Sequence, residues 1–221
     1  MKNIFFHQRG KEDRPGPDKF LWLLVLLLLF TVRPLPASTG ITLLLIGDSL
    51  SSGYGLQGPG WVAQTNQSLA EQGYQVNIVN DSISGDTTAG GVARIRDGID
   101  RIKPDWVILE LGGNDGLRGL SPREIESNLS KMVSIANESG VKAMLLGIQI
   151  PPNYGKTYTE RFAKAFENVS EATQSPLLPY FIGSVGGDPG FNQADMIHPN
   201  DLAQPLIRDR VLPFIKSVLG I

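Results

Sequence analysis

Short apolar runs alternate along this chain, from Ile41 onward, with longer segments in which apolar residues recur at helical spacing. The run Ile41–Ile46 ends at Gly47 and is typical of a strand that is buried on both faces of a sheet. Further strands are predicted over residues 76–79, 106–111, 141–150 and 177–178, and helices over residues 60–71, 89–102, 121–137, 158–171 and 201–219. This alternation predicts an α/β fold, a three-layer α/β/α sandwich with a central five-stranded parallel sheet.

The first 37 residues differ in composition from the rest of the chain. Five basic residues precede the apolar run 20–30, and the small residue Ala37 follows close to two prolines. These features resemble a secretory signal, so we expect residues 1–37 to be a signal peptide that is cleaved after Ala37. The alternative is an uncleaved inner-membrane anchor over residues 20–32, although a membrane span needs roughly 20 apolar residues.

Both interpretations of the leader predict an exported protein with one folded domain over residues 38–221. We expect this domain to be periplasmic or secreted, or anchored in the inner membrane if the leader is uncleaved. Without residues 1–37 the chain keeps 14 of its 20 Lys and Arg and 19 of its 22 Asp and Glu, a net charge of −5. This charge gives no reason to expect a nucleic-acid partner, and membrane contact is expected only through the leader.

The content of cysteine and histidine limits the chemistry that the domain can perform. The chain has no cysteine, which excludes disulfides, a cysteine nucleophile and an iron–sulfur cluster. Of its two histidines, His7 lies in the leader, so His198 is the single imidazole of the domain. One histidine without cysteine is too few for a zinc hydrolase, and we expect no metal or cofactor.

Polar, glycine-bearing segments follow three of the predicted strands, and a fourth polar segment precedes the last predicted helix. They are Gly47–Leu50, Ser82–Asp86, Gly112–Asp115 and Asp195–His198. In open parallel sheets the ligand crevice lies beyond the carboxyl ends of the strands. We therefore expect these four segments to meet at one edge of the sheet.

Ser49 and His198 are suited to nucleophilic catalysis. A serine hydroxyl is a poor nucleophile until a base takes its proton, and histidine is the usual base because its pKa lies near 7. A carboxylate is then needed to orient the imidazolium, and Asp195 lies three residues before His198. Asp115 is the main alternative for this acid. The negative tetrahedral oxygen needs donors, which the N–H groups of Ser49 and Gly85 and the amide of Asn114 can supply.

Each of these residues also has a purely structural interpretation. Ser49 is placed to cap a helix, Gly85 to supply a positive φ, and Asn114 to close a turn. His198, before a proline, is placed like a surface-loop histidine. The ordered occurrence of all four segments favours the catalytic interpretation.

The four segments resemble, in order, the blocks of the SGNH/GDSL hydrolases. The matching strings are Gly47-Asp48-Ser49-Leu50-Ser51, Ser84-Gly85-Asp86-Thr87, Gly112-Gly113-Asn114-Asp115 and Asp195-x-x-His198-Pro199-Asn200. The resemblance spans about residues 42–213 and is closest to bacterial periplasmic enzymes described as thioesterases, lysophospholipases, arylesterases and proteases. It implies a flavodoxin-like SGNH hydrolase fold, with Ser49, Asp195 and His198 as the triad and Ser49, Gly85 and Asn114 as the oxyanion hole.

Two further segments bear on the substrate pocket. Pro151, Asn153 and Tyr154 follow the fourth predicted strand and resemble the loop that lines the acyl pocket in that group, although an ordinary proline-rich connection is the alternative. Tyr54 and Leu56, just after the nucleophile, are candidates for the border of the same pocket. The triad loop has one departure, Met196, where that group has an acidic residue followed by glycine.

The resemblance implies a serine hydrolase that cleaves carboxylic esters and thioesters, including lysophospholipids, through an acyl-enzyme intermediate. A carbohydrate O-deacetylase uses the same residues on polar substrates, and a catalytically silent binding module is the non-enzymatic alternative. Ser51 stands where the G-x-S-x-G motif of the nucleophile elbow has its second glycine, and the first loop lacks the G-x-G-x-x-G of dinucleotide binders. We expect a monomer that acts on a small acyl substrate.

Overall fold

The computed structural model of the protein describes Met1 and residues 40–221. The predicted leader, with its apolar run 20–30, the alternative anchor over residues 20–32 and the cleavage position at Ala37, lies outside the described residues. Within the described part of the chain, no helix combines the length and apolar character that a membrane crossing requires. Residues 40–221 form one compact unit, which holds the fold and the site.

Five parallel strands form the central sheet in the order β2-β1-β3-β4-β5. They are β1 (Ile41–Gly47), β2 (Val76–Asn80), β3 (Trp106–Glu110), β4 (Lys142–Leu146) and β5 (Leu177–Leu178). Residues 43–46 of β1 are fully buried, as expected for a strand with helices over both faces. The predicted α/β class and parallel five-stranded sheet are confirmed, and the strand order is that of flavodoxin-like folds.

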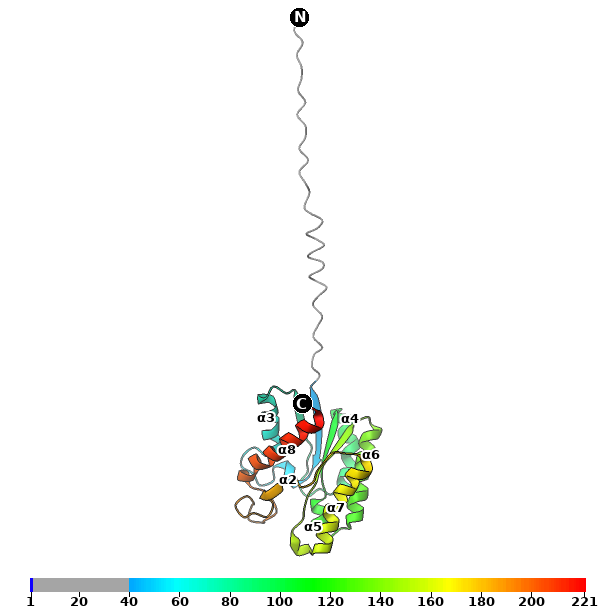
Figure 1. Ribbon diagram of the computed structural model, residues 1–221, viewed down its shortest axis with the longest axis vertical. Coiled ribbons are helices and arrows are strands. Elements are labelled where there is room, and N and C mark those ends of the chain that lie inside the picture. Colours follow the sequence, from blue (N-terminus) through cyan, green and yellow to red (C-terminus); the bar gives the residue numbers. More distant parts are fainter. Residues whose placement is uncertain (2–39) are drawn as a thin grey trace. The chain divides into compact units, whose positions relative to one another are not determined.

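Five long helices cover the two faces of the sheet. Helices α3 (Trp61–Glu71) and α8 (Gln204–Leu219) pack against each other on one side, and α4 (Thr88–Ile102), α6 (Pro122–Glu138) and α7 (Lys156–Thr173) pack side by side on the other (Figure 1). The core between these layers is aromatic as well as aliphatic. The Trp61 and Phe181 rings lie 5.9 Å apart between centroids, and Phe162 and Phe166 meet edge to face at 5.5 Å. The three layers predicted from the sequence are confirmed.

The end of the fourth strand was predicted wrongly. Its predicted range reached Ile150, but β4 ends at Leu146 because the short β5 offers partners only to Leu145 and Leu146. Beyond it, the Gly147 N–H donates to the Leu178 carbonyl at 2.8 Å, and a Cβ at residue 147 would clash with the Pro179 carbonyl oxygen. The chain therefore leaves the sheet at a glycine, and residues 148–150 are free to line a cavity.

Short helical elements account for the other differences from the predicted boundaries. The last helix was expected from Asp201, but residues 201–203 form the 3-10 turn η3 (Asp201–Ala203), which Asn200 caps through its Oδ1, and α8 begins at Gln204. Four elements were not predicted: α2 (Ser49–Ser52), α5 (Gly113–Leu117), η1 (Pro152–Tyr154) and η2 (Gly183–Val185). They are three to five residues long, too short for a helical period to show in the sequence.

Candidate active site

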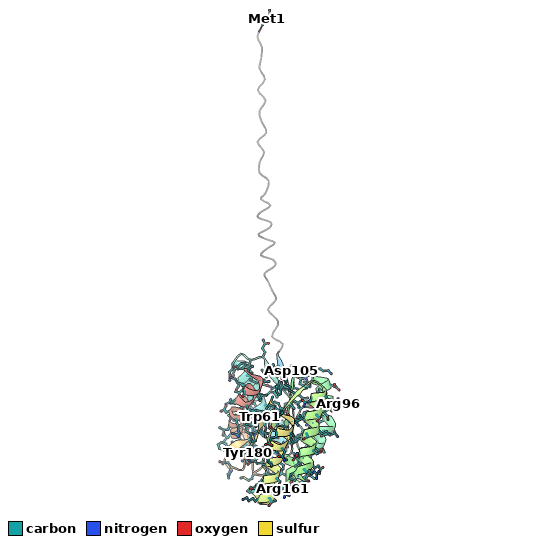
Figure 2. The ribbon with its side chains drawn as sticks, turned by 45° about the vertical axis from the view of Figure 1, so that its right-hand side comes forward. Met1, Trp61, Arg96, Asp105, Arg161 and Tyr180 are labelled. Carbon is teal, nitrogen blue, oxygen red and sulfur yellow. The ribbon has the colours of Figure 1, made fainter. Side chains whose placement is uncertain are left out.

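The carboxyl ends of β1, β2 and β3 lie next to one another because the three strands pair in parallel. Three predicted site residues lie in the segments that follow these strands. Ser49 is the first residue of α2 after β1, Gly85 lies in the loop after β2, and Asn114 is in α5 after β3. Figure 2 shows Asp105, which directly precedes β3, near one end of the domain and Tyr180, which follows β5, nearer the other. The structure thus brings the predicted strand-end segments to one edge of the sheet.

Ser49, His198 and Asp195 form one hydrogen-bonded chain. The Ser49 Oγ lies 2.9 Å from His198 Nε2, and His198 Nδ1 lies 2.7 Å from Asp195 Oδ2. The other oxygen of Asp195 accepts the backbone N–H groups of Ile197 at 2.9 Å and of His198 at 3.0 Å. The tight turn that places Asp195 beside the imidazole is therefore held by the same carboxylate that contacts the ring.

These hydrogen bonds also set the charge of Asp195. Partial burial acts to raise its pKa, but the donors from the His198 backbone, the His198 ring and the Ile197 backbone outweigh it and lower the pKa of Asp195 to about 2. Asp195 is therefore ionised throughout the neutral range. An ionised carboxylate at Nδ1 holds the imidazole in the orientation that leaves Nε2 facing the serine hydroxyl.

The hydrogen bonds at the start of α2 show that Ser49 is not the residue that caps this helix. Asp48, not Ser49, caps α2, because its Oδ1 accepts the Leu50 N–H at 2.9 Å. The Ser49 hydroxyl is therefore free to face His198. Asp48 is almost fully buried, and that burial raises its pKa to about 6 against the lowering effect of the Leu50 N–H, His198 and the Asn114 amide.

The three expected oxyanion donors differ in whether their hydrogens already have hydrogen-bond acceptors. In the described part of the chain, no acceptor takes the backbone N–H of Ser49 or of Gly85. Gly85 has a φ of +82°, so the turn does need glycine, and the space where a side chain would project is open. By contrast, Asn114 Nδ2 donates to Asp48 Oδ2 at 3.0 Å and to the Asp86 carbonyl at 2.9 Å, so both of its amide hydrogens have partners.

Asp115, the alternative acid for the triad, is directed elsewhere. Its buried carboxylate accepts the Thr88 N–H at 2.9 Å and the Thr88 hydroxyl at 2.5 Å. It thus anchors the first residue of α4 to α5, and the hydrogen-bonded partner of His198 is Asp195.

A cavity of about 790 Å³ opens at Ser49 and His198. Apolar side chains of Leu117, Ile148, Ile150 and Ile182 contribute to its wall, together with the three predicted residues Pro151, Asn153 and Tyr154. Tyr54 and Leu56 are not among the lining residues. The Tyr54 ring packs instead on the His198 ring, with 4.6 Å between centroids. Among residues 40–221, no group of three or more His, Asp or Glu side chains is arranged to hold a metal ion.

Comparison with known proteins identifies the family. Residues 45–204 match the model of the GDSL-like Lipase/Acylhydrolase family. The chain belongs to this family.

Named relatives agree with that assignment. Esterase TesA of Pseudomonas aeruginosa is 47% identical over 179 residues, which cover 80% of this chain and 89% of TesA. The Escherichia coli protein named thioesterase 1/protease 1/lysophospholipase L1 is 39% identical over 193 residues, 86% of this chain and 90% of that one. The crystal structure of the psychrotrophic esterase EstA from Pseudoalteromonas sp., inhibited by monoethylphosphonate, is similar with a TM-score of 0.78 at 37% identity, and the match covers 81% of this chain and 99% of EstA. This GDSL-family chain is an ester-cleaving serine hydrolase, as the sequence predicts.

Two segments that line the cavity of this GDSL-family hydrolase were not predicted from the sequence. The segment 148–150 was hidden because it was predicted as strand. The segment 180–187, which supplies Tyr180, Ile182 and three glycines, was not singled out. Its run of glycines after β5, the last strand, was the available signal, since such loops follow the other strands that form the site.

Met196, the departure in the triad loop, is held in an unusual backbone conformation. Its φ is +59°, in the left-handed region that favours glycine, and its side chain lines the cavity. Its N–H donates to the Gln193 carbonyl at 2.9 Å, so the turn between Gln193 and His198 fixes this conformation. A side chain in this region costs on the order of 1–2 kcal/mol.

We therefore predict that Met196→Gly is more stable than Met196→Ala by about 1 kcal/mol, because both remove the side chain but only glycine adopts a positive φ freely. Urea unfolding of the two variants measures the difference. The control is Ala70→Gly at an exposed helical position. There, replacing alanine by glycine is expected to lower stability by roughly 0.5–1 kcal/mol. Equal stability of the two Met196 variants would contradict the strain at this position.

Proposed function

We propose that Ser49, His198 and Asp195 are the catalytic triad of this esterase, and that Ser49, Gly85 and Asn114 form its oxyanion hole. The observation that carries the proposal is the continuous hydrogen-bonded chain from Asp195 through His198 to the Ser49 hydroxyl, at the mouth of the cavity. Nucleophile, base and orienting acid are each within hydrogen-bond reach of the next, which is the arrangement that activates a serine.

In the proposed reaction, His198 Nε2 takes the Ser49 proton as Oγ attacks the acyl carbonyl carbon. The free N–H groups of Ser49 and Gly85 receive the negative oxygen of the tetrahedral intermediate. The protonated His198 then gives its proton to the leaving alcohol or thiol, and the acyl group stays on Ser49. His198 then deprotonates a water molecule, which attacks the carbonyl carbon of the acyl-enzyme. As the bond from that carbon to Ser49 Oγ breaks, the protonated His198 returns its proton to Oγ, and the carboxylic acid is released.

In this mechanism, the Asn114 amide keeps one of its two hydrogen-bond acceptors and exchanges the other for the oxyanion. A hydrogen bond to a carboxylate is stronger than one to a neutral carbonyl, so the bond to Asp48 is the one retained. The hydrogen now donated to the Asp86 carbonyl turns to the oxyanion as charge develops there. This step makes the third donor specific to the transition state, which is where a donor accelerates the reaction.

The Ser49→Ala variant tests the mechanism. We expect it to lose about 10⁴-fold or more of kcat, because the group that forms the acyl-enzyme is gone. Hydrolysis of p-nitrophenyl esters measures the loss. Ser52→Ala is the matched control on the same helix, since the Ser52 hydroxyl contacts Ser84 at 2.7 Å and not His198. Activity of Ser49→Ala close to that of the wild type would contradict the proposed triad.

We further propose acyl esters and thioesters with flexible acyl chains, including lysophospholipids, as the substrates. The apolar wall formed by Leu117, Ile148, Ile150 and Ile182 supports this class, because it offers an acyl chain apolar surface but gives sugar hydroxyls few partners. The names of two relatives, esterase and thioesterase 1/protease 1/lysophospholipase L1, agree with it.

Chain-length dependence tests the substrate class. We predict that kcat/KM rises from p-nitrophenyl acetate to the hexanoate by up to about fourfold per methylene, since each buried methylene contributes roughly 0.8 kcal/mol. The dodecanoate shows where the cavity is filled. A preference for acetate would favour the carbohydrate O-deacetylase, and no turnover of any ester would favour a silent binding module.

For the export of the protein we propose that residues 1–37 are the leader and that residues 38–221 are the mature domain. Cleavage after Ala37 would leave the sheet intact, because β1 begins at Ile41. The mass of the protein recovered from the periplasm of the expressing bacterium tests this proposal. A chain that begins at Ser38 is expected, and a full-length membrane-bound chain would contradict cleavage.

A further inference from the structure

A carboxyl group without a part in the proposed reaction is buried next to the nucleophile turn. Glu110 is the last residue of β3, is fully buried, and pairs in register with Gly47 at the end of β1. Its Oε2 accepts the Ser51 hydroxyl at 2.5 Å and the Asp48 backbone N–H at 3.3 Å. Glu110 therefore holds the residue before and a residue after Ser49 with one oxygen atom.

The space around this carboxyl is narrow. A Cβ at Gly47 would lie 2.7 Å from Glu110 Oε2 and 2.7 Å from Ser82 Oγ, so only glycine fits at the end of β1. Two buried polar atoms here, Glu110 Oε1 and Ser82 Oγ, have no hydrogen-bond partner in the described part of the chain. An ionised carboxylate with an unpartnered buried oxygen is costly, whereas a protonated acid needs no counter-charge.

The charged groups around Glu110 also favour its protonated form. Asp48 is the charged neighbour that acts on it directly, and burial together with Asp48 raises the pKa of Glu110 well above its usual range. His198 and Asp115 act on Asp48 in turn. The Arg94 guanidinium, packed from α4, contacts the Gly47 carbonyl at 3.2 Å, as well as Asp81 and Asp86, and makes no ion pair with Glu110.

Asp48 is the better placed of the two carboxyls to carry charge. Each of its two oxygens accepts a donor, the Leu50 N–H at 2.9 Å and the Asn114 amide at 3.0 Å, whereas only one oxygen of Glu110 has donors within the described residues. A negative charge on buried Asp48 opposes the ionisation of buried Glu110 and raises the pKa of its carboxyl group. The single negative charge therefore belongs on Asp48, where it orients Asn114, and the retained proton belongs on Glu110.

We propose that Glu110 is a positioning residue that works as a neutral acid, fixing the turn that carries Ser49 and the carboxylate that orients Asn114. The inference rests on the proposed roles of Ser49 and Asn114. A neutral group serves here because a second negative charge beneath the turn would oppose the charge that develops on the oxyanion. Displacement of a catalytic group by about 1 Å is enough to cost a factor of 10² in rate.

Two variants and one control separate this role from a general effect on folding. Glu110→Gln keeps a neutral acceptor for Ser51 and Asp48, and we expect its kcat to stay within about threefold of the wild type. Glu110→Leu removes the acceptor, and we expect kcat to fall about ten- to a hundredfold with KM nearly unchanged. Ser82→Ala is the control, because it removes a neighbouring hydroxyl that has no hydrogen-bond partner among residues 40–221.

Infrared difference spectroscopy observes the proton itself. At mildly alkaline pH, above the pKa of Asp48, the wild type minus Glu110→Gln spectrum is expected to contain the carbonyl band of a protonated carboxylic acid. This readout does not depend on activity, so it stays separate from a failure of Ser49→Ala. If Glu110→Leu does not fold, the Gln variant and the infrared band decide. Absence of the band would overturn the proposal, and so would a Glu110→Gln variant that loses more than about tenfold in kcat. A folded Glu110→Leu variant with wild-type kcat would also overturn it. The same holds if Ser82→Ala lowers kcat as much as Glu110→Leu does.

Discussion

Parallel pairing of β1 with β2 and β3 is the constraint on which the site depends. It places Gly47 opposite Glu110 and brings the ends of three strands into contact. Ser49, Gly85 and Asn114 are far apart along the chain, and each comes within one short turn of this common edge. A sheet of different register would separate the nucleophile from its oxyanion donors, whatever the loops contained.

His198 reaches this edge from the far end of the sequence and is held there by polar contacts between loops. Gln193 donates from its side chain to the Tyr54 carbonyl at 2.8 Å and from its backbone to the His198 carbonyl at 2.8 Å. Asp201 accepts the Gly58 N–H at 2.8 Å. These bonds join the loop after the nucleophile to the loop of the triad, so the serine and the histidine are positioned by the same set of contacts.

Much of the fold was predictable because its signals are local. Continuous apolar runs marked the strands, helical spacing marked the long helices, and the single histidine of the domain left His198 as the only base. The walls of the cavity were harder to predict. Ile148 and Ile150 have strand-like sequence, and only the shortness of β5 and the turn at Gly147 take them out of the sheet.

The buried polar groups were not predictable at all, because their meaning lies in contacts between distant residues. Glu110 has the sequence context of an ordinary strand end, and its partners are 59 and 62 residues away. Asp48 caps α2 locally, but its contact with Asn114 spans 66 residues. Met196 was recognised as a departure, while its positive φ became visible only in the structure.

Catalysis through a covalent bond at Ser49 is central to the proposed function. Reaction with an activated alkylphosphonate ester, followed by peptide mapping in a mass spectrometer, tests it most directly. We expect one phosphonyl group per chain, carried by the hydroxyl of Ser49. Loss of activity with the label on Ser51, Ser52 or His198, or with no covalent label, would contradict the covalent mechanism.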